Sequence, residues 1–192
     1  MAFRFRPCRI PDVVCVEPDV YRDPRGFFAE IYKATDFKAF GLAGPIAQVN
    51  HSKSQKNVLR GLHYQLQPSA QAKMVTVVSG EIFDVAVDVR RGSPHFGQWV
   101  GEKLDADKKN MLYIPEGFAH GFCVLSDTAE VIYFCSAVYD PKTERGLIYN
   151  DPAVGIAWPV KDPILSAKDE KYPLLANVET NFVYAGEGKM RK

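Results

Sequence analysis

Short runs of alternating apolar and polar residues, separated by clusters of glycine, proline, serine and aspartate, dominate the middle of this chain. Within residues 82–89, apolar side chains at the odd positions alternate with Asp84 and Asp88 at even ones. A strand has a period of two, so both carboxylates would share one face. Many short strands at this spacing predict an all-β chain folded as an antiparallel sandwich or barrel.

We expect strands over the following segments: 74–79, 82–89, 98–104, 111–114, 121–125 and 130–139. The first two flank the dipeptide at 80–81, a short glycine-containing turn that predicts a hairpin. The only helical pattern of any strength lies at 35–40, with Thr35 or Asp36 as its N-cap.

A chain of 192 residues is long enough to bury a sizeable core, and we expect one domain over 1–192. We interpret about 1–30 as an N-terminal arm. Beyond residue 150 the chain is rich in proline, which predicts a wrapping tail with short helical turns over about 150–192.

Charge and hydropathy exclude several classes of partner. The 24 basic and 23 acidic residues leave a net charge of +1, which gives no reason to expect nucleic acid or an anionic membrane. No apolar run is long enough to span a bilayer, and the N-terminus lacks the apolar stretch of a secretory signal. The four cysteines form no Cys-x-x-Cys pair. We expect them to be small buried side chains of a protein in the reducing cytoplasm.

Two of the four histidines lie in glycine-punctuated apolar runs, RGLHYQ at 60–65 and IPEGFAHGF at 114–122. In the second run a tight turn is followed at once by a strand, whose first inward residue is His120. Histidine gives or takes a proton near neutral pH more easily than any other side chain. His63 and His120 in one pocket therefore suggest proton transfer or a metal.

The neighbours of His63 favour proton transfer. A single histidine near a strand end is usually structural. Here Arg60 lies three residues before His63 and Lys73 follows at the start of the next strand, and these cations suit an anionic substrate. A jelly-roll metal site usually has His-x-His, and here the second position is Gln65. His63 and His120 alone are too few ligands, so no metal is expected.

Other candidates are ambiguous from the sequence alone. Tyr133 alternates with apolar residues in 130–139 and is typical of a core tyrosine with its hydroxyl bonded. Asp169 is by itself an ordinary surface or turn residue. Asp84 and Asp88 are either solvated or directed into a polar barrel lumen.

Seven motifs in order carry a family resemblance: DPRGFFAE at 23–30, QVNHS at 48–52, VLRGLHYQ at 58–65, QAK at 71–73, GEIFDVAVD at 80–88, IPEGFAHGF at 114–122 and NDP at 150–152. Together they resemble the dTDP-4-dehydrorhamnose 3,5-epimerase family. The resemblance extends from about residue 18 to residue 169, which is nearly the whole chain.

The resemblance implies an all-β, cupin-like double-stranded β-helix, or jelly roll, with short peripheral helices. It also implies a homodimer, no metal, no cofactor and a role in dTDP-rhamnose synthesis for cell-surface polysaccharides. The implied catalytic residues are His63 as base, Asp169 as its partner, Tyr133 as acid on the opposite face, and Lys73 beside the developing enolate.

The resemblance further implies a set of substrate-binding residues: Phe28, Gln48, Asn50, Arg60, His120, Glu144 and Lys168. Arg25 and Glu30, which by themselves are typical of a solvated edge strand, match contacts that the family supplies from the partner subunit.

The chain departs from the family pattern beside the expected acid. Phe134 stands where a lysine is usual, Ala137 and Val138 replace an acidic and an aromatic residue, and 146–149 differs from a Gly-Ile-Arg-Trp-like run. Three functions therefore remain open. They are inversion at both C3 and C5, inversion at one of these centres or on another nucleotide diphosphate sugar, and non-catalytic binding of a sugar nucleotide.

Overall fold

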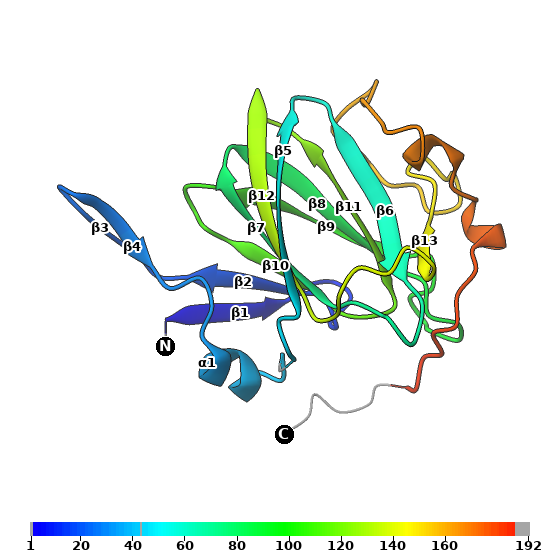
Figure 1. Cartoon of the computed structure of the whole chain (residues 1–192), viewed down its shortest axis with the longest axis horizontal. Helices are drawn as coiled ribbons and strands as arrows, with labels where there is room; N and C mark the ends of the chain where they lie inside the picture. Colours follow the sequence, from blue (N-terminus) through cyan, green and yellow to red (C-terminus); the bar gives the residue numbers. More distant parts are fainter. Residues whose placement is uncertain (1, 43, 187–192) are drawn as a thin grey trace.

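The computed structural model describes residues 2–42 and 44–186, and nearly all of the regular structure in it is β (Figure 1). One antiparallel sheet has the strand order β1 (Phe3–Pro7), β2 (Val14–Pro18), β10 (Met111–Ile114), β7 (Lys73–Ser79), β12 (Thr128–Cys135) and β5 (Gln48–Gln55). The second antiparallel sheet has the order β13 (Glu144–Gly146), β6 (Leu59–Gln65), β11 (Phe118–Val124), β8 (Glu81–Asp88) and β9 (Trp99–Asp105).

The two sheets face each other across an apolar core. Val75 and Val77 of β7 pack there against Ile82 and Ala86 of β8, and Phe122 of β11 belongs to the same cluster. Apolar side chains alternate with polar ones along these strands, so each sheet buries one face in this core. The predicted cupin-like jelly roll is confirmed.

The outer faces of the sheets are covered by other parts of the chain. Helix α1 (Ala34–Ala39) places Phe37 against β1, β2 and β10 outside the first sheet. The tail beyond residue 150 covers the second sheet with Val154, Val178 and Phe182. This tail contains two short 3₁₀ helices, η1 (Asp169–Lys171) and η2 (Leu175–Asn177).

A two-stranded hairpin of β3 (Val20–Asp23) and β4 (Gly26–Ala29) projects away from the two sheets (Figure 1). Its large side chains are exposed, Phe27 at 54% and Phe28 at 65%. The hairpin therefore presents apolar surface that this chain does not itself cover.

The predicted hairpin of 74–79 with 82–89 is wrong, because β7 and β8 belong to different sheets. β7 pairs with β10 and β12, and β8 pairs with β9 and β11, so neither strand has a free edge for the other. Between them Gly80 has φ +77°, and a Cβ there would lie 2.1 Å from the carbonyl oxygen of Thr128. Gly80 forms a corner between the sheets, which only glycine fits.

Two further details differ from prediction. The strand expected over 130–139 ends at Cys135, which pairs with Gln48 and Lys73, the first residues of both neighbouring strands. Beyond that point no strand among residues 2–42 and 44–186 pairs with it. The helix begins after Lys33, which makes no side-chain cap, rather than at Thr35 or Asp36.

The four cysteines are free and buried, as expected. No helix in the described part of the chain is long and apolar enough to cross a membrane.

Candidate active site

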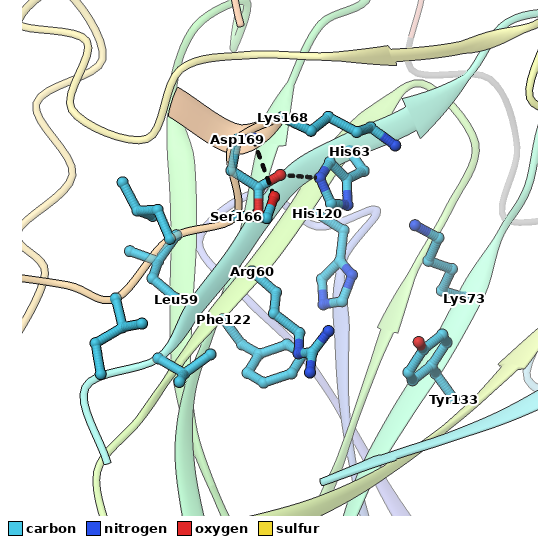
Figure 2. Close-up of a pocket in the computed structure, with 13 residues that line it drawn as sticks. Leu59, Arg60, His63, Lys73, His120, Phe122, Tyr133, Ser166, Lys168 and Asp169 are labelled. Atoms are coloured by element: carbon cyan, nitrogen blue, oxygen red, sulfur yellow. Dashed lines mark hydrogen bonds and ion pairs between the residues drawn. The ribbon is translucent and has the colours of Figure 1, made fainter. Parts of the chain in front are cut away.

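A pocket of about 380 Å³ lies between the two sheets and is closed on one side by the tail (Figure 2). Small-molecule sites usually fall in the range of roughly 300–1,000 Å³. Its polar lining comes from three parts of the fold: Arg60, His63 and His120 of the second sheet, Lys73 and Tyr133 of the first, and Ser166, Lys168 and Asp169 of the tail.

Glycines bring the two histidine-bearing strands close together. His63 of β6 lies directly opposite His120 of β11, and the register shifts just beyond this pair. A Cβ on Gly61 would lie 2.6 Å from the Cα of Gly121, and Gly61 has φ +117°. Gly61, two residues before His63, and Gly121, directly after His120, are therefore required by close backbone approach.

His63 is paired with Asp169, and the two atoms His63 Nε2 and Asp169 Oδ1 are 2.5 Å apart. Asp169 is 3% exposed, and its backbone N–H donates to Ser166 Oγ. Burial alone would raise the pKa of Asp169, but the hydrogen bond and charge of His63 lower it overall. The ionised carboxylate takes the Nε2–H, which leaves Nδ1 of His63 as a proton acceptor.

His120 has a carboxylate partner of its own. Its Nε2 lies 2.7 Å from Asp84 Oδ1, and both side chains are buried. Burial lowers the pKa of His120, so the ring is neutral and donates Nε2–H to Asp84. Asp84 therefore faces the interior, whereas Asp88 is bound by Arg90 and Ser93 away from the pocket. The solvated interpretation of both aspartates is wrong.

Lys73 and Tyr133 come from the facing sheet. Lys73 pairs with Cys135 and Val75 with Tyr133, so Lys73 and Tyr133 share the inner face of the sheet. Burial lowers the pKa of Lys73 and raises that of Tyr133. The tyrosine hydroxyl thus stays protonated at neutral pH. Figure 2 shows Lys73 and Tyr133 together on one side of the pocket, across from Asp169 and His63.

Of the other predicted residues, Arg60 and Lys168 line this pocket, whereas Gln48, Asn50 and Glu144 do not line it. Arg60 donates from Nε to Ser54 Oγ at 3.0 Å, and Lys168 forms an ion pair with Glu144. Gln48 donates to Asn50 at 2.8 Å. Asn50 lies directly opposite Tyr133 in the ladder, so both amides belong to the same inner face.

Arg25, Phe28 and Glu30 are not brought to the pocket of this chain. Arg25 forms an exposed ion pair with Asp23 in the turn of the projecting hairpin, and Phe28 is on β4. Glu30 follows β4 directly.

Ser166 and Tyr172 were not predicted from the sequence as part of the site. Ser166 accepts the Asp169 N–H, and the Ser-x-x-Asp spacing that precedes a helical turn is a recognisable capping signal. Tyr172 packs on the His63 ring, and no local pattern marks it. Among residues 2–42 and 44–186, no group of three or more His, Cys, Asp or Glu side chains is placed to hold a metal.

The family model and the similar proteins described next all point to one family. The model of the dTDP-4-dehydrorhamnose 3,5-epimerase family matches residues 7–177, which include every residue that lines the pocket. A dTDP-4-dehydrorhamnose 3,5-epimerase from Shigella flexneri is 55% identical over 161 residues, covering 83% of this chain and 89% of that protein. A dTDP-4-dehydrorhamnose 3-epimerase from Streptomyces niveus is 44% identical, covering 90% of this chain and 84% of that protein.

Solved structures agree with the sequence comparison. The dTDP-6-deoxy-D-glucose-3,5-epimerase from Legionella pneumophila, in complex with dTDP-4-keto-L-rhamnose, superposes with a TM-score of 0.89. It is 45% identical, and the match covers 92% of this chain and 95% of that one.

Proposed function

The chain belongs to the dTDP-4-dehydrorhamnose 3,5-epimerase family, and we propose that it inverts C3 and C5 of dTDP-4-dehydro-6-deoxyglucose to give dTDP-4-dehydrorhamnose. The observation that carries this proposal is the position of the His63–Asp169 pair on one wall of the pocket and of Tyr133 and Lys73 on the other. The relatives act at carbons beside a ketone, and this arrangement suits that chemistry.

The reaction needs a base, a positive charge and an acid. The 4-keto group acidifies the C–H bonds at C3 and C5, and removal of one proton sends the electron pair to the carbonyl oxygen as an enolate. A group of positive charge or hydrogen-bond donors must stabilise that oxygen. Inversion then requires a proton from the opposite face, so the acid must be a different residue from the base.

His63 is the proposed base. Asp169 holds the Nε2–H and leaves Nδ1 free to take the C–H proton. The same carboxylate stabilises the imidazolium that forms, as in other carboxylate–histidine pairs. Removing the negative charge of Asp169 would therefore raise the activation barrier for proton abstraction by His63.

Lys73 is the proposed enolate stabiliser. Its ammonium is enclosed in the pocket near His120 and Asp84, and burial has already lowered its pKa. A cation in a partly desolvated site interacts more strongly with a developing oxyanion than it would in water.

Tyr133 is the proposed acid. Its hydroxyl borders the pocket from the sheet opposite His63, and burial keeps it protonated well above neutral pH. It can return a proton to carbon on the face opposite the one that His63 deprotonates. Exchange with solvent then resets both groups for the second centre.

The test is proton exchange in D₂O. Incubation with dTDP-4-keto-6-deoxyglucose should place deuterium at both C3 and C5, with inverted stereochemistry, as followed by NMR. His63→Ala should lower both rates by at least the ~10²–10⁴-fold typical of a positioned acid or base. His95→Ala, which alters a histidine outside the pocket, is the matched control and should be unaffected. Absence of exchange at both carbons in the unmodified protein would refute the proposal.

A single-centre epimerase is the second candidate, because the Streptomyces niveus relative is named as a 3-epimerase. Deuterium and inversion at C3 alone would establish that activity for this chain.

We further propose a homodimer in which the β3–β4 hairpin delivers Arg25, Phe28 and Glu30 to the partner's pocket. The exposed Phe27 and Phe28 and the distance of the hairpin from the sheets support this arrangement (Figure 1). Light scattering should give twice the chain mass, and Arg25→Ala should raise KM without altering the chain fold. A monomer with full activity would exclude it. The cytoplasmic location stays a prediction.

A further inference from the structure

Tyr172 contacts the proposed base from outside the pocket. Its ring meets the His63 ring edge-on, with centroids 5.4 Å apart and planes inclined at 66°. Tyr172 does not line the pocket, whereas His63 does. The tyrosine thus contacts the proposed base without bordering the pocket itself.

The Tyr172 ring packs on the backbone of β13. Gly146 lies opposite His63 in the β13–β6 ladder, and a Cβ on Gly146 would lie 2.4 Å from three ring atoms of Tyr172. The backbone of Gly146 is not in the left-handed region. Glycine is required there by the ring and not by backbone conformation, so the ring and the glycine form a matched pair.

Tyr172 also belongs to the segment that carries Asp169. It is the C-cap residue of η1, which begins at Asp169. The next residue, Pro173, accepts a hydrogen bond from Ile148 N–H at 3.0 Å. The Tyr172 ring thus lies between η1 on one side and β13 and β6 on the other.

The contact depends on the ring and not on the hydroxyl group. The hydroxyl oxygen is buried and has no hydrogen-bond partner among the described residues. Since it bonds nothing, its removal should leave the position of the ring unchanged.

We propose that Tyr172, which packs on Gly146, is a positioning residue that keeps Asp169 in hydrogen-bonding geometry with His63. The proposal rests on the proposed role of His63 as the base. The Tyr172 ring would act in two ways. It limits rotation of the His63 imidazole, and it sets the distance between η1 and β6. Asp169 is also held by its own N–H bond to Ser166 Oγ, but the Tyr172 ring packs edge-on against the imidazole side of the 2.5 Å contact.

Four variants test the idea: Tyr172→Phe, Tyr172→Ala, Gly146→Ala and the double variant Gly146→Ala/Tyr172→Ala. Displacement of a catalytic group by about 1 Å costs up to ~10²-fold in rate. Tyr172→Ala and Gly146→Ala should each lower kcat for exchange by about 10- to 100-fold, with KM changed less than about threefold. Tyr172→Phe should retain kcat within about twofold, since it keeps the ring.

The double variant separates this mechanism from general destabilisation. Once the ring is gone, the added methyl group has room, so Gly146→Ala should cause no further loss in the Tyr172→Ala background. Additive losses in the double variant, or an unchanged kcat in Tyr172→Ala, would overturn the proposal. Thermal unfolding of each variant confirms that the measured protein is folded, and Gly146→Ala decides the matter if Tyr172→Ala does not fold.

An NMR measurement keeps this test independent of the proposed activity. In protein labelled with ¹⁵N-histidine, the proton shared by His63 and Asp169 should give a downfield signal that His63→Gln removes. Tyr172→Phe should retain the signal, and Tyr172→Ala should lose or shift it. If the unmodified protein shows this signal but no exchange of substrate protons, the proposed function fails and the positioning role stands. An unchanged signal in Tyr172→Ala refutes the positioning role alone.

Discussion

Replacement of Asp169 by asparagine tests the charge of the His63–Asp169 pair, because it removes the negative charge and keeps the size of the side chain. The carboxylate is 3% exposed and 2.5 Å from His63 Nε2. Asparagine has the same size and keeps one oxygen that can accept the Nε2–H. The substitution therefore leaves the packing of η1 intact and removes one negative charge beside the imidazole.

The expected magnitude follows from the two kinds of hydrogen bond. A bond to a charged group contributes about 1.5–3 kcal/mol, and one between neutral groups about 0.5–1.5 kcal/mol. The imidazolium formed in the transition state should lose the difference, about 1–1.5 kcal/mol. At roughly 1.4 kcal/mol for each factor of ten, the rate should fall about 5- to 12-fold.

The loss should be far larger if the amide turns its NH₂ toward Nε2. The proton of the ring would then reside on Nδ1, and His63 could not accept the substrate proton. An equivalent change in a Ser-His-Asp triad costs ~10⁴-fold. Either result supports a functional carboxylate, and the size of the loss reports which way the amide faces.

The assay is the initial rate of deuterium incorporation at C3 and C5, with substrate well above KM. Asp127→Asn is the matched control, because Asp127 is an exposed carboxylate paired with Lys56. Thermal unfolding shows whether the variant is folded. A rate for Asp169→Asn within twofold of the unmodified protein would refute the assigned role of the pair.

Three further predictions concern the acid, the absence of a metal and pH. Tyr133→Phe should separate exchange from inversion, because His63 can still remove a proton and return it to the same face; a normal ratio of inverted to exchanged sugar would make Tyr133 a structural residue. Exchange activity should survive exhaustive chelation, since His63 and His120 are each occupied by a carboxylate; loss restored by one divalent metal contradicts this. Burial lowers the pKa of His120 below the ~6.5 of an unfolded chain. The unfolded state then binds the extra proton, so the free energy of unfolding should fall as pH drops below about 6.5. Urea unfolding at several pH values should show a shallower fall in His120→Asn, and equal slopes would contradict the assignment.

The strand pattern could be predicted because it is local. Alternation identified the segments that became β7, β8, β9 and β10 to within a residue or two. Sheet membership could not be predicted in this way. The Gly80-Glu81 dipeptide is typical of a hairpin turn, yet β7 pairs with β10 and β12, and β8 pairs with β9 and β11.

In the candidate site, too, residues with a local sequence signal could be predicted and those brought in by the fold could not. The two glycine-flanked histidines stand out in the sequence because close strand approach requires glycine beside them. The partner of His63 does not stand out, since Asp169 is 106 residues away along the chain. The tail returns it to β6 through a parallel bridge between Val58 and Ile164. Its role was implied by family resemblance alone, and Tyr172 had neither a local signal nor a family motif.

The two-sheet architecture lets the proposed base and the proposed acid approach opposite faces of one sugar. Side chains on one face of a single sheet all project to the same side, so His63 and Tyr133 on one sheet would approach the ring from one direction. Here they project toward each other from different sheets. Their separation is fixed by the apolar core below the pocket, where Val77 of one sheet packs with Ile82 of the other. Because such cores are packed as densely as crystals, the gap is rigid. The geometry required by the proposed inversion thus depends on core residues that do not line the pocket, as well as on those that do.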